Sequence, residues 1–357
     1  MSWPEGEMRA FLVDAARQGS WRPTRMPDPA PGTALVRVRA VGLCGTDAHL
    51  WTGLSPNLQR GLTTYPWQPG HEWCGEVVAV AGGAVGGHPV VGDLVVGDPF
   101  VTCGTCEVCR RRGRAAHCPN RVEIGVRGHA PGALAEFVRV PVANLTRVPD
   151  GVRPIEATLA EPATTALHAL DVARLRPGGD ACVIGTGTLG LIAIQVAVAA
   201  GADVSAVGVD DAGLALAESI GATVARPGEL AGGAFDTVIE ASGARTSLAE
   251  ASRLVSVGGS IGLVGYPAEA QVPIDAAGLI MAGASLHGVL GGIDRMRDAL
   301  VLISRGVIDP AALIDGVHGP ERAAQCLDDL MSSRARPKLV IAWEPGELSA
   351  QGTETRA

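Results

Sequence analysis

The sequence predicts an α/β protein of two domains, a β-barrel-like domain and a doubly wound parallel sheet. The chain has 357 residues, which is more than one ordinary hydrophobic core holds. Up to about residue 155, short apolar stretches are separated by glycine and proline, as in a barrel of short strands. Beyond that point strands alternate with helices, which indicates parallel strands joined by helical connections.

The first domain is expected to begin with short strands. Residues 34–41 alternate apolar and polar side chains, as a half-buried strand does. Pro27, Pro29 and Pro31 break the chain before this strand, and a glycine-rich turn at 82–87 separates two others. The expected strands are residues 8–14, 34–41, 76–80, 93–96 and 134–140.

The second domain opens with helical spacing of apolar residues over 156–170, and a buried strand follows. Its strands are expected at 181–184, 204–207, 237–240, 260–264 and 285–290. The helices between them are expected at 189–200, 213–220 and 246–254. Two further helices at 293–305 and 319–331, and a strand at 338–342, complete the expected elements.

The composition limits the classes of partner. A net charge of −8 and the lack of a basic stripe argue against nucleic acid. Apolar runs stay below the roughly 18 residues of a membrane span, and residues 1–8 are acidic and polar, unlike a signal peptide. We therefore expect a cytoplasmic protein with no nucleic-acid and no membrane partner. Lys338 is the only lysine among 29 basic residues, which we attribute to composition.

A glycine-rich turn follows the expected strand at 181–184 and opens the next helix. Its glycines have G-x-G-x-x-G spacing: the first permits a tight turn, the second lets a pyrophosphate approach, and the third lets strand and helix pack closely. Free N–H groups at the helix start would face the phosphates. The residues predicted to bind a dinucleotide are Gly185, Thr186, Gly187, Thr188, Leu189 and Gly190.

The residue that would bind the adenosine ribose is ambiguous. Counting back from Gly221 puts Gly208 where an acid is expected, whereas counting forward from Gly190 reaches Asp210. No arginine follows Gly208 to hold a 2′-phosphate, and Asp210 and Asp211 would repel one. NAD is therefore favoured as cofactor, while NADP stays open. The two aspartates could equally cap a helix.

Four of the eight cysteines lie close together, with the spacing C-x2-C-x2-C-x8-C. Clustered cysteines in an intracellular chain indicate metal binding more than disulfides. Four thiolates would form a closed tetrahedral zinc site, which staples a lobe at 100–120 and has no open position for catalysis. The predicted ligands are Cys103, Cys106, Cys109 and Cys118.

A second set of metal-ligand residue types is dispersed along the chain, at Cys44, His71, Glu72 and Glu161. Thiolate, imidazole and carboxylate leave one position for an exchangeable ligand, which is the pattern of a catalytic zinc. Each residue alone is a weak signal, since a lone cysteine is more often a small core residue. Together, in this order and followed by a dinucleotide turn, they form a much stronger one.

These motifs resemble the zinc-containing medium-chain alcohol dehydrogenase family over nearly the whole chain, from Met8 to Trp343. Glu72 and Glu161 are similar to its polyol (sorbitol), threonine and cyclitol dehydrogenase branch. The resemblance implies a GroES-like catalytic domain and a Rossmann dinucleotide-binding domain. Their expected bounds are 1–158 with 294–357 for the first, and 159–293 for the second.

The resemblance also implies roles for single residues. Cys44 and His71 would bind the catalytic zinc, and either Glu72 or Glu161 would complete it; the sequence leaves that choice open. The last gap in the four-cysteine cluster is one residue longer than the family's usual seven, so the loop there must bulge.

A proton relay is implied on the segment after Cys44. Thr46 would carry the relay hydroxyl, and His49, unless it is a plain surface histidine, would be the outer base. Asp47 would support His71 from behind. Thr165 would lie beside the nicotinamide ring.

The implied function is zinc-dependent, NAD(P)-linked oxidation of a secondary alcohol to a ketone, or the reverse, by a homodimer or homotetramer. A polyol, sugar or cyclitol is the expected small-molecule substrate. Alternatives are a dehydrogenase of a hydrophobic cyclic alcohol, a zinc-free reductase and a non-catalytic relative. The four-cysteine lobe argues against the reductase, and the intact ligand set argues against the non-catalytic relative. Trp51, Trp67 and Arg127 could contact the substrate, or could be packing and surface residues.

Overall fold

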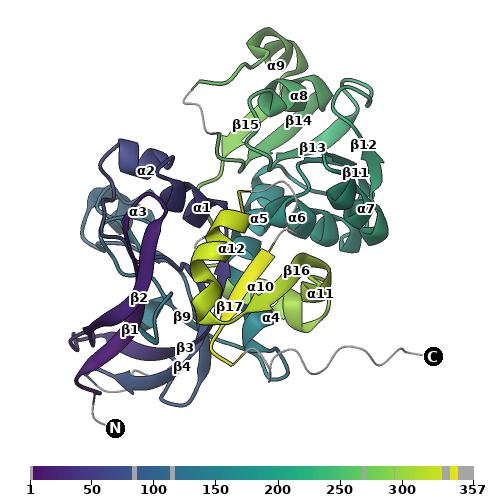
Figure 1. Ribbon diagram of the computed structural model, residues 1–357. Helices are drawn as coiled ribbons and strands as arrows, with labels where there is room; N and C mark the ends of the chain where they lie inside the picture. Colours follow the sequence, from purple (N-terminus) through teal and green to yellow (C-terminus); the bar gives the residue numbers. More distant parts are fainter. Residues whose placement is uncertain are drawn as a thin grey trace. The chain divides into compact units, whose positions relative to one another are not determined.

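The computed structural model describes residues 3–82, 87–112, 117–267, 271–292, 294–331 and 338–344. The chain divides into two compact units (Figure 1). The first unit contains the residues up to Glu161, Met296–Ser304, and the residues from Ile314 on. The second unit contains Pro162–Arg295 and Arg305–Leu313.

One short segment groups differently from its expected domain. The sequence places residues 305–313 in the first domain, whereas in the structure they belong to the second unit. The backbone N–H of Asp309 donates to Gln195 Oε1 at 3.0 Å, and Ile308 is fully buried. These contacts attach the segment to the helix that carries Gln195.

The first unit is built on a seven-stranded sheet in the order β16-β17-β3-β4-β5-β9, with β8 pairing with β3. The late strand β17 pairs antiparallel with β3 and parallel with β16, so the C-terminal part of the chain completes this sheet. Strands β1 and β2 form a separate hairpin, and β6 pairs with β7. The strands are β1 (Glu7–Ala15), β2 (Gln18–Arg25), β3 (Thr33–Leu43), β4 (Glu72–Val80), β5 (Leu94–Gly97), β6 (Phe100–Val101), β7 (Val122–Glu123), β8 (Phe137–Pro141), β9 (Leu145–Arg147), β16 (Ile314–His318) and β17 (Lys338–Ala342).

All five strands expected in this unit's first part are present, with ends shifted by a few residues. Strand β2 was missed because its sequence, Gln-Gly-Ser-Trp-Arg-Pro-Thr-Arg, lacks apolar alternation. Close packing fixes Gly97: a Cβ atom there would lie 2.3 Å from the ring of the buried Trp73. The helices of this unit are α1 (Gly45–Thr52), α2 (Pro56–Gln59), α3 (Glu107–Arg112), α4 (Pro154–Ala157), α10 (Met296–Ser304) and α12 (Ala323–Asp329), with 3-10 turns at Val142–Asn144 and Pro320–Arg322.

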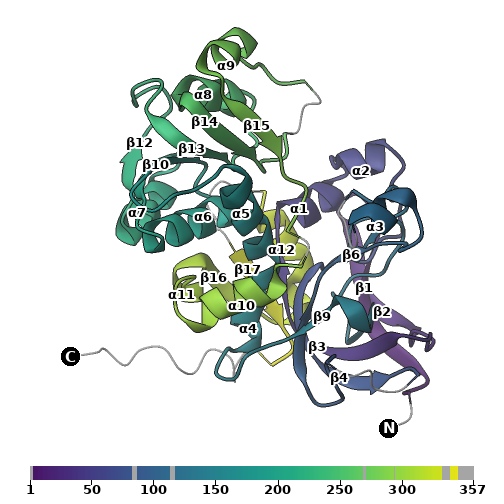
Figure 2. The ribbon, with the colours of Figure 1, turned by 180° about the vertical axis from the view of Figure 1, so that it is seen from behind.

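The second unit is a six-stranded parallel sheet in the order β12-β11-β10-β13-β14-β15. The order reverses at β10, which confirms the predicted doubly wound sheet. Helices α6 and α7 cover one face, and α8 and α9 cover the other (Figure 2). The elements are β10 (Asp180–Ile184), β11 (Asp203–Val207), β12 (Thr223–Ala225), β13 (Phe235–Glu240), β14 (Val255–Leu263), β15 (Ser285–Gly288), α5 (Ala160–Val172), α6 (Thr188–Ala199), α7 (Asp211–Ile220), α8 (Ser247–Leu254), α9 (Ala276–Ala282) and α11 (Pro310–Leu313).

The five expected strands of this unit and the three helices expected between them are present, and the sequence missed three elements, β12, α9 and α11. The edge strand β12 has only three residues, too few for a periodic pattern. Helix α9 is missed because its residues are apolar yet largely exposed, so they show no amphipathic stripe. Helix α11 has only four residues, too few for a helical period.

Candidate metal and cofactor sites

Cys44 sits between strand β3 and helix α1 and caps the helix. Its sulfur accepts the backbone N–H of Thr46 at 3.3 Å, and its own backbone N–H donates to Asp47 Oδ2 at 3.1 Å. This reciprocal pair is a capping box in which a thiol replaces the usual hydroxyl. The Cys-Gly-Thr-Asp motif therefore fixes the direction of the Cys44 side chain.

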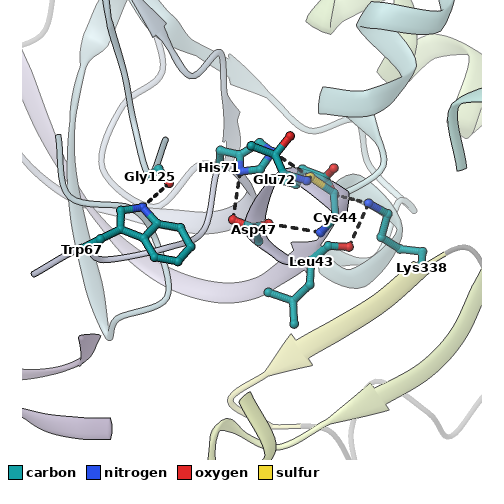
Figure 3. Close-up of polar contacts among 9 residues, drawn as sticks. Leu43, Cys44, Asp47, Trp67, His71, Glu72, Gly125 and Lys338 are labelled. Carbon is teal, nitrogen blue, oxygen red and sulfur yellow. Dashed lines mark hydrogen bonds and ion pairs between the residues drawn. The ribbon is translucent and has the colours of Figure 1, made fainter. Parts of the chain in front are cut away.

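His71 precedes β4 and reaches Cys44 from the neighbouring strand (Figure 3). Its Nε2 lies 3.2 Å from Cys44 Sγ, and its Nδ1 lies 3.3 Å from Oδ1 of the fully buried Asp47. The turn before it needs a glycine, because Gly70 has φ +103° and a Cβ atom there would lie 2.6 Å from the backbone of Leu134. The predicted pairing of Cys44, Asp47 and His71 is therefore present in the fold.

Glu72 and Glu161 bring two carboxylates to the same place. Ligand atoms of His71, Glu72 and Glu161 all lie within 4.8 Å of one another, as do those of Cys44, Asp47 and His71. Glu72 and His71 are buried, whereas Cys44 and Glu161 are partly exposed. The partly exposed side is where an exchangeable ligand could enter.

Lys338 is the site residue that the sequence interpretation missed. Its ammonium is fully buried and donates to Glu72 Oε2 at 2.5 Å and to the carbonyl oxygen of Leu43 at 3.2 Å (Figure 3). The one feature of the sequence that could have identified Lys338 is that it is the only lysine of the chain, which from the sequence alone we attribute to composition. Burial disfavours its charge, yet Glu72, Cys44 and Asp47 together outweigh burial and raise the pKa of Lys338.

Carboxylates outnumber ammonium groups in this cluster. Among the described residues, the carboxylates of Asp47, Glu72 and Glu161 face one buried ammonium, Lys338. Burial, together with the nearby charge of Glu72, raises the pKa of Glu161 to about 8, and His71 and Lys338 only partly offset this. Burial lowers the pKa of His71, but Asp47 and Cys44 outweigh it and raise that pKa well above its usual range. A pocket that holds protons so firmly has the charge and the donor atoms to hold Zn²⁺ instead.

The four cysteines of the lobe have the geometry of a closed site. The three S···S distances Cys103–Cys118, Cys106–Cys118 and Cys103–Cys109 are 3.6, 3.8 and 4.0 Å. A tetrahedral zinc with Zn–S bonds of about 2.3 Å has S···S edges of about 3.8 Å. Backbone N–H groups of Thr105 and Cys106 lower the pKa of Cys103 to about 5, which favours the thiolate. The four side chains thus fit a zinc ion, with the loop of the longer gap lying partly outside the described residues.

The glycine turn of the second unit connects β10 to α6. Gly185 has φ +108°, and a Cβ atom at Gly190 would lie 1.9 Å from its carbonyl oxygen, so both positions need glycine. Gly187 is the N-cap of α6, and Thr186 lies on the turn beside it. Thr188 and Leu189 form the first turn of that helix, and Thr165 is half-buried on α5.

The two candidate ribose positions lie together after β11. Gly208 follows that strand directly, and its backbone N–H donates to the carbonyl of Ala225 at 3.1 Å. The Asp210 carboxylate accepts the backbone N–H of Gly213 at 2.8 Å, so Asp210 is the N-cap of α7. The helix-cap alternative for Asp210 is therefore the one that the structure confirms.

The relay candidates lie on α1, and the two tryptophans form hydrogen bonds within the first unit. Thr46 is partly exposed and His49 half-buried on this helix. The indole N–H of Trp51 donates to Asp328 Oδ1 at 2.9 Å, and that of Trp67 donates to the carbonyl of Gly125 at 2.7 Å (Figure 3). Both indoles pack in the core, and Trp67 also lines a small pocket together with Arg127. None of the described helices is long and apolar enough to cross a membrane.

Comparisons with known proteins identify the family of the chain. Residues 30–150 match the model of the alcohol dehydrogenase GroES-like domain, and residues 188–305 match that of the zinc-binding dehydrogenases. The chain is 31% identical to an L-threonine 3-dehydrogenase of Deinococcus deserti over 354 residues, covering 94% of this chain and 99% of that protein.

Two further relatives are an enzyme and a solved structure. The chain is 31% identical to an L-galactonate-5-dehydrogenase of Escherichia coli over 277 residues, covering 72% of this chain and 76% of that protein. A structure from Sinorhizobium meliloti, of zinc-binding dehydrogenase type and bound to NADP, has a TM-score of 0.85 and 28% identity. It covers 94% of this chain and 99% of its own, and the predicted fold class is thereby confirmed.

Proposed function

Since the chain belongs to the zinc-containing medium-chain alcohol dehydrogenase family, we propose that it oxidises a secondary alcohol of polyol, sugar or cyclitol type to a ketone, or catalyses the reverse. Family membership carries the zinc dependence and the NAD or NADP cofactor. The observation that carries the proposal is the pairing of Cys44 and His71 at 3.2 Å with carboxylates in ligand reach.

The names of the relatives support the substrate class. L-Threonine and L-galactonate both carry a secondary hydroxyl next to a carbon that bears a polar group. A substrate of this kind is the best starting point for this chain. A panel of such alcohols would identify the substrate within this class.

We propose that Cys44, His71 and Glu161 hold the catalytic zinc, and that Glu72 is not a ligand. Glu72 has its Oε2 bonded to Lys338 in a fully buried ion pair, so moving it onto a metal would leave the ammonium unpaired. Glu161 lies in ligand reach of His71, and its raised pKa marks a carboxylate that a cation would stabilise. Asp47, close to Nδ1 of His71, keeps Nε2 directed toward Cys44.

The bound groups supply two kinds of chemistry: zinc lowers the pKa of a hydroxyl group, and the nicotinamide ring takes up or gives a hydride. The residues of the chain handle the proton. Thr46 and His49 are three residues apart on α1, so they share one face of the helix. Burial lowers the pKa of His49, which keeps its imidazole neutral near pH 7 and able to accept the proton that Thr46 passes on.

Metal analysis combined with an activity screen tests this function. Purified protein should contain zinc at both clusters and reduce NAD or NADP with secondary polyols, sugars or cyclitols. Primary and hydrophobic cyclic alcohols are the comparison substrates. Activity that persists after zinc has been removed from the Cys44 site would contradict the proposal, as would a clear preference for hydrophobic cyclic alcohols.

A further inference from the structure

Three adjacent strands of the second unit end at one edge of the sheet, in the order β12-β11-β10. The residues that follow them are Arg226, Gly208 and Gly185. The backbone N–H of Gly185 donates to the carbonyl of Val207 at 2.8 Å, and that of Gly208 to the carbonyl of Ala225 at 3.1 Å. These three positions are therefore consecutive along the carboxyl edge, where ligands of doubly wound sheets bind.

The end of β11 lacks the carboxylate that would receive a ribose 2′-hydroxyl. A Cβ atom at Gly208 would lie 3.0 Å from Leu214 Cδ2 and 3.1 Å from Thr186 Oγ1, so a side chain there would crowd its neighbours. The next carboxylate, that of Asp210, is bound to the backbone of Gly213 as a helix cap. The position is therefore small and has no acid directed into it from Gly208 or Asp210.

Arg226 extends from β12 across to the segment that follows β11. One guanidinium nitrogen donates to the carbonyl of Val209, and another pairs with the Asp211 carboxylate. The Asp211 side chain is 92% exposed and that of Arg226 is 42% exposed. An exposed pair of this kind contributes little free energy, so an incoming anion could take the place of Asp211.

We propose that this chain selects NADP over NAD, with Arg226 binding the 2′-phosphate and Gly208 placing no carboxylate against it. The proposal rests on the proposed function, since it takes the Gly185 turn to bind a nicotinamide dinucleotide. A phosphate dianion offers Arg226 charge-assisted hydrogen bonds that a ribose hydroxyl cannot match. The sequence favours NAD because no arginine follows Gly208 directly and because Asp210 and Asp211 would repel a phosphate. The pairing of β11 with β12 brings Arg226 to this place, and the Asp210 carboxylate is bound to the backbone of Gly213.

Calorimetric binding of two cofactor fragments tests the selection without zinc, alcohol or turnover. The probes are 2′,5′-ADP, which carries the extra phosphate, and 5′-AMP, which does not. The full-length protein should bind 2′,5′-ADP at least about 10-fold more tightly than 5′-AMP. Arg226→Gln should lose roughly 10- to 100-fold in affinity for 2′,5′-ADP while 5′-AMP binding stays unchanged.

Two further variants complete the test. The first is a control, and the second should change the affinity for 2′,5′-ADP in the opposite direction. Arg174→Gln removes the same charge from an exposed position that precedes β10, at the amino edge of the sheet, and should change neither affinity. Asp211→Asn removes the competing carboxylate and should tighten 2′,5′-ADP binding by a few-fold. The thermal midpoint of each variant shows that it is folded.

The outcomes separate this proposal from the proposed function. Equal affinity for the two fragments, or an unchanged affinity ratio in Arg226→Gln, would overturn the selection of NADP. Zinc-dependent oxidation of alcohols with NAD would still stand in that case, because the fragments do not probe the zinc site. A loss confined to 2′,5′-ADP in Arg226→Gln, with the opposite change in Asp211→Asn, supports the assignment of Arg226.

Discussion

The two metal clusters of the first unit are built in opposite ways. The four cysteines come from one short stretch, in which the N–H groups of Cys106 and Cys109 donate to the sulfur of the preceding cysteine in the cluster. The Cys44 cluster draws its residues from the ends of β3, β4, α5 and β17, far apart in the sequence. The first site has as many ligands as a closed zinc needs. The second brings two glutamates within ligand reach of His71, and Lys338 binds one of them, Glu72.

The difference teaches that local spacing specifies a closed site, whereas an open site depends on the whole sheet. In the lobe, S···S distances near 3.8 Å are already those of a zinc tetrahedron. In the Cys44 cluster, the excess of carboxylates over ammonium groups favours a bound cation. We therefore expect variants of the lobe to lower the stability of the fold and variants of the Cys44 cluster to lower the rate of alcohol oxidation.

The largest expected effect is on turnover, from Cys44→Ala. Removing the thiolate should reduce kcat/KM for alcohol oxidation by on the order of 10,000-fold, because the metal would lose a ligand and its hold on the substrate hydroxyl. The thermal midpoint should change little, and zinc should be lost from this cluster only. Steady-state kinetics and metal analysis of the same preparation measure all three quantities.

Cys106→Ser should have the reverse profile. The lobe would lose one of four ligands, and the free energy of unfolding should fall by about 5 kcal/mol, since metal binding contributes directly to folding. Protein that remains folded at low temperature should retain most of its kcat. A stable Cys106→Ser variant with little activity would contradict the division between the two clusters.

Lys338→Met probes the carboxylate of Glu72. It leaves Glu72 buried without its partner, and breaking a buried pair in this way costs about 3–5 kcal/mol of stability. The double variant Lys338→Met/Glu72→Gln removes both charges and should recover most of that loss. Chemical denaturation at neutral pH measures both variants, and equal instability in the two would show that Lys338 acts through packing instead of charge.

The same contrast explains what the sequence could predict. The lobe and the Gly185 turn are local motifs, so spacing alone identifies their residues. Lys338 meets Glu72 only because β17 pairs with β3, and Arg226 reaches the end of β11 only because the three-residue strand β12 pairs there. Such partnerships depend on register between distant strands, which periodicity does not reveal. Cys44, His71 and both glutamates were predicted as candidates, but the choice between the glutamates needed the partner of one of them.

The smallest expected effect concerns His49, whose role depends on being neutral. Burial lowers its pKa, so at pH 7 the imidazole carries no charge and accepts a proton; it becomes charged only as the pH falls through the lowered value, below about 6.5. The kcat/KM for alcohol oxidation should therefore fall on the acid side of that pH. His49→Gln should reduce kcat/KM by about 10- to 100-fold at pH 7 and flatten this acid limb, with zinc content unchanged. If the loss of activity at acid pH persists in His49→Gln, the titration belongs to another group and His49 has no part in the proton relay. In that case the metal ligands near Cys44 would be the residues of this neighbourhood that act in the reaction.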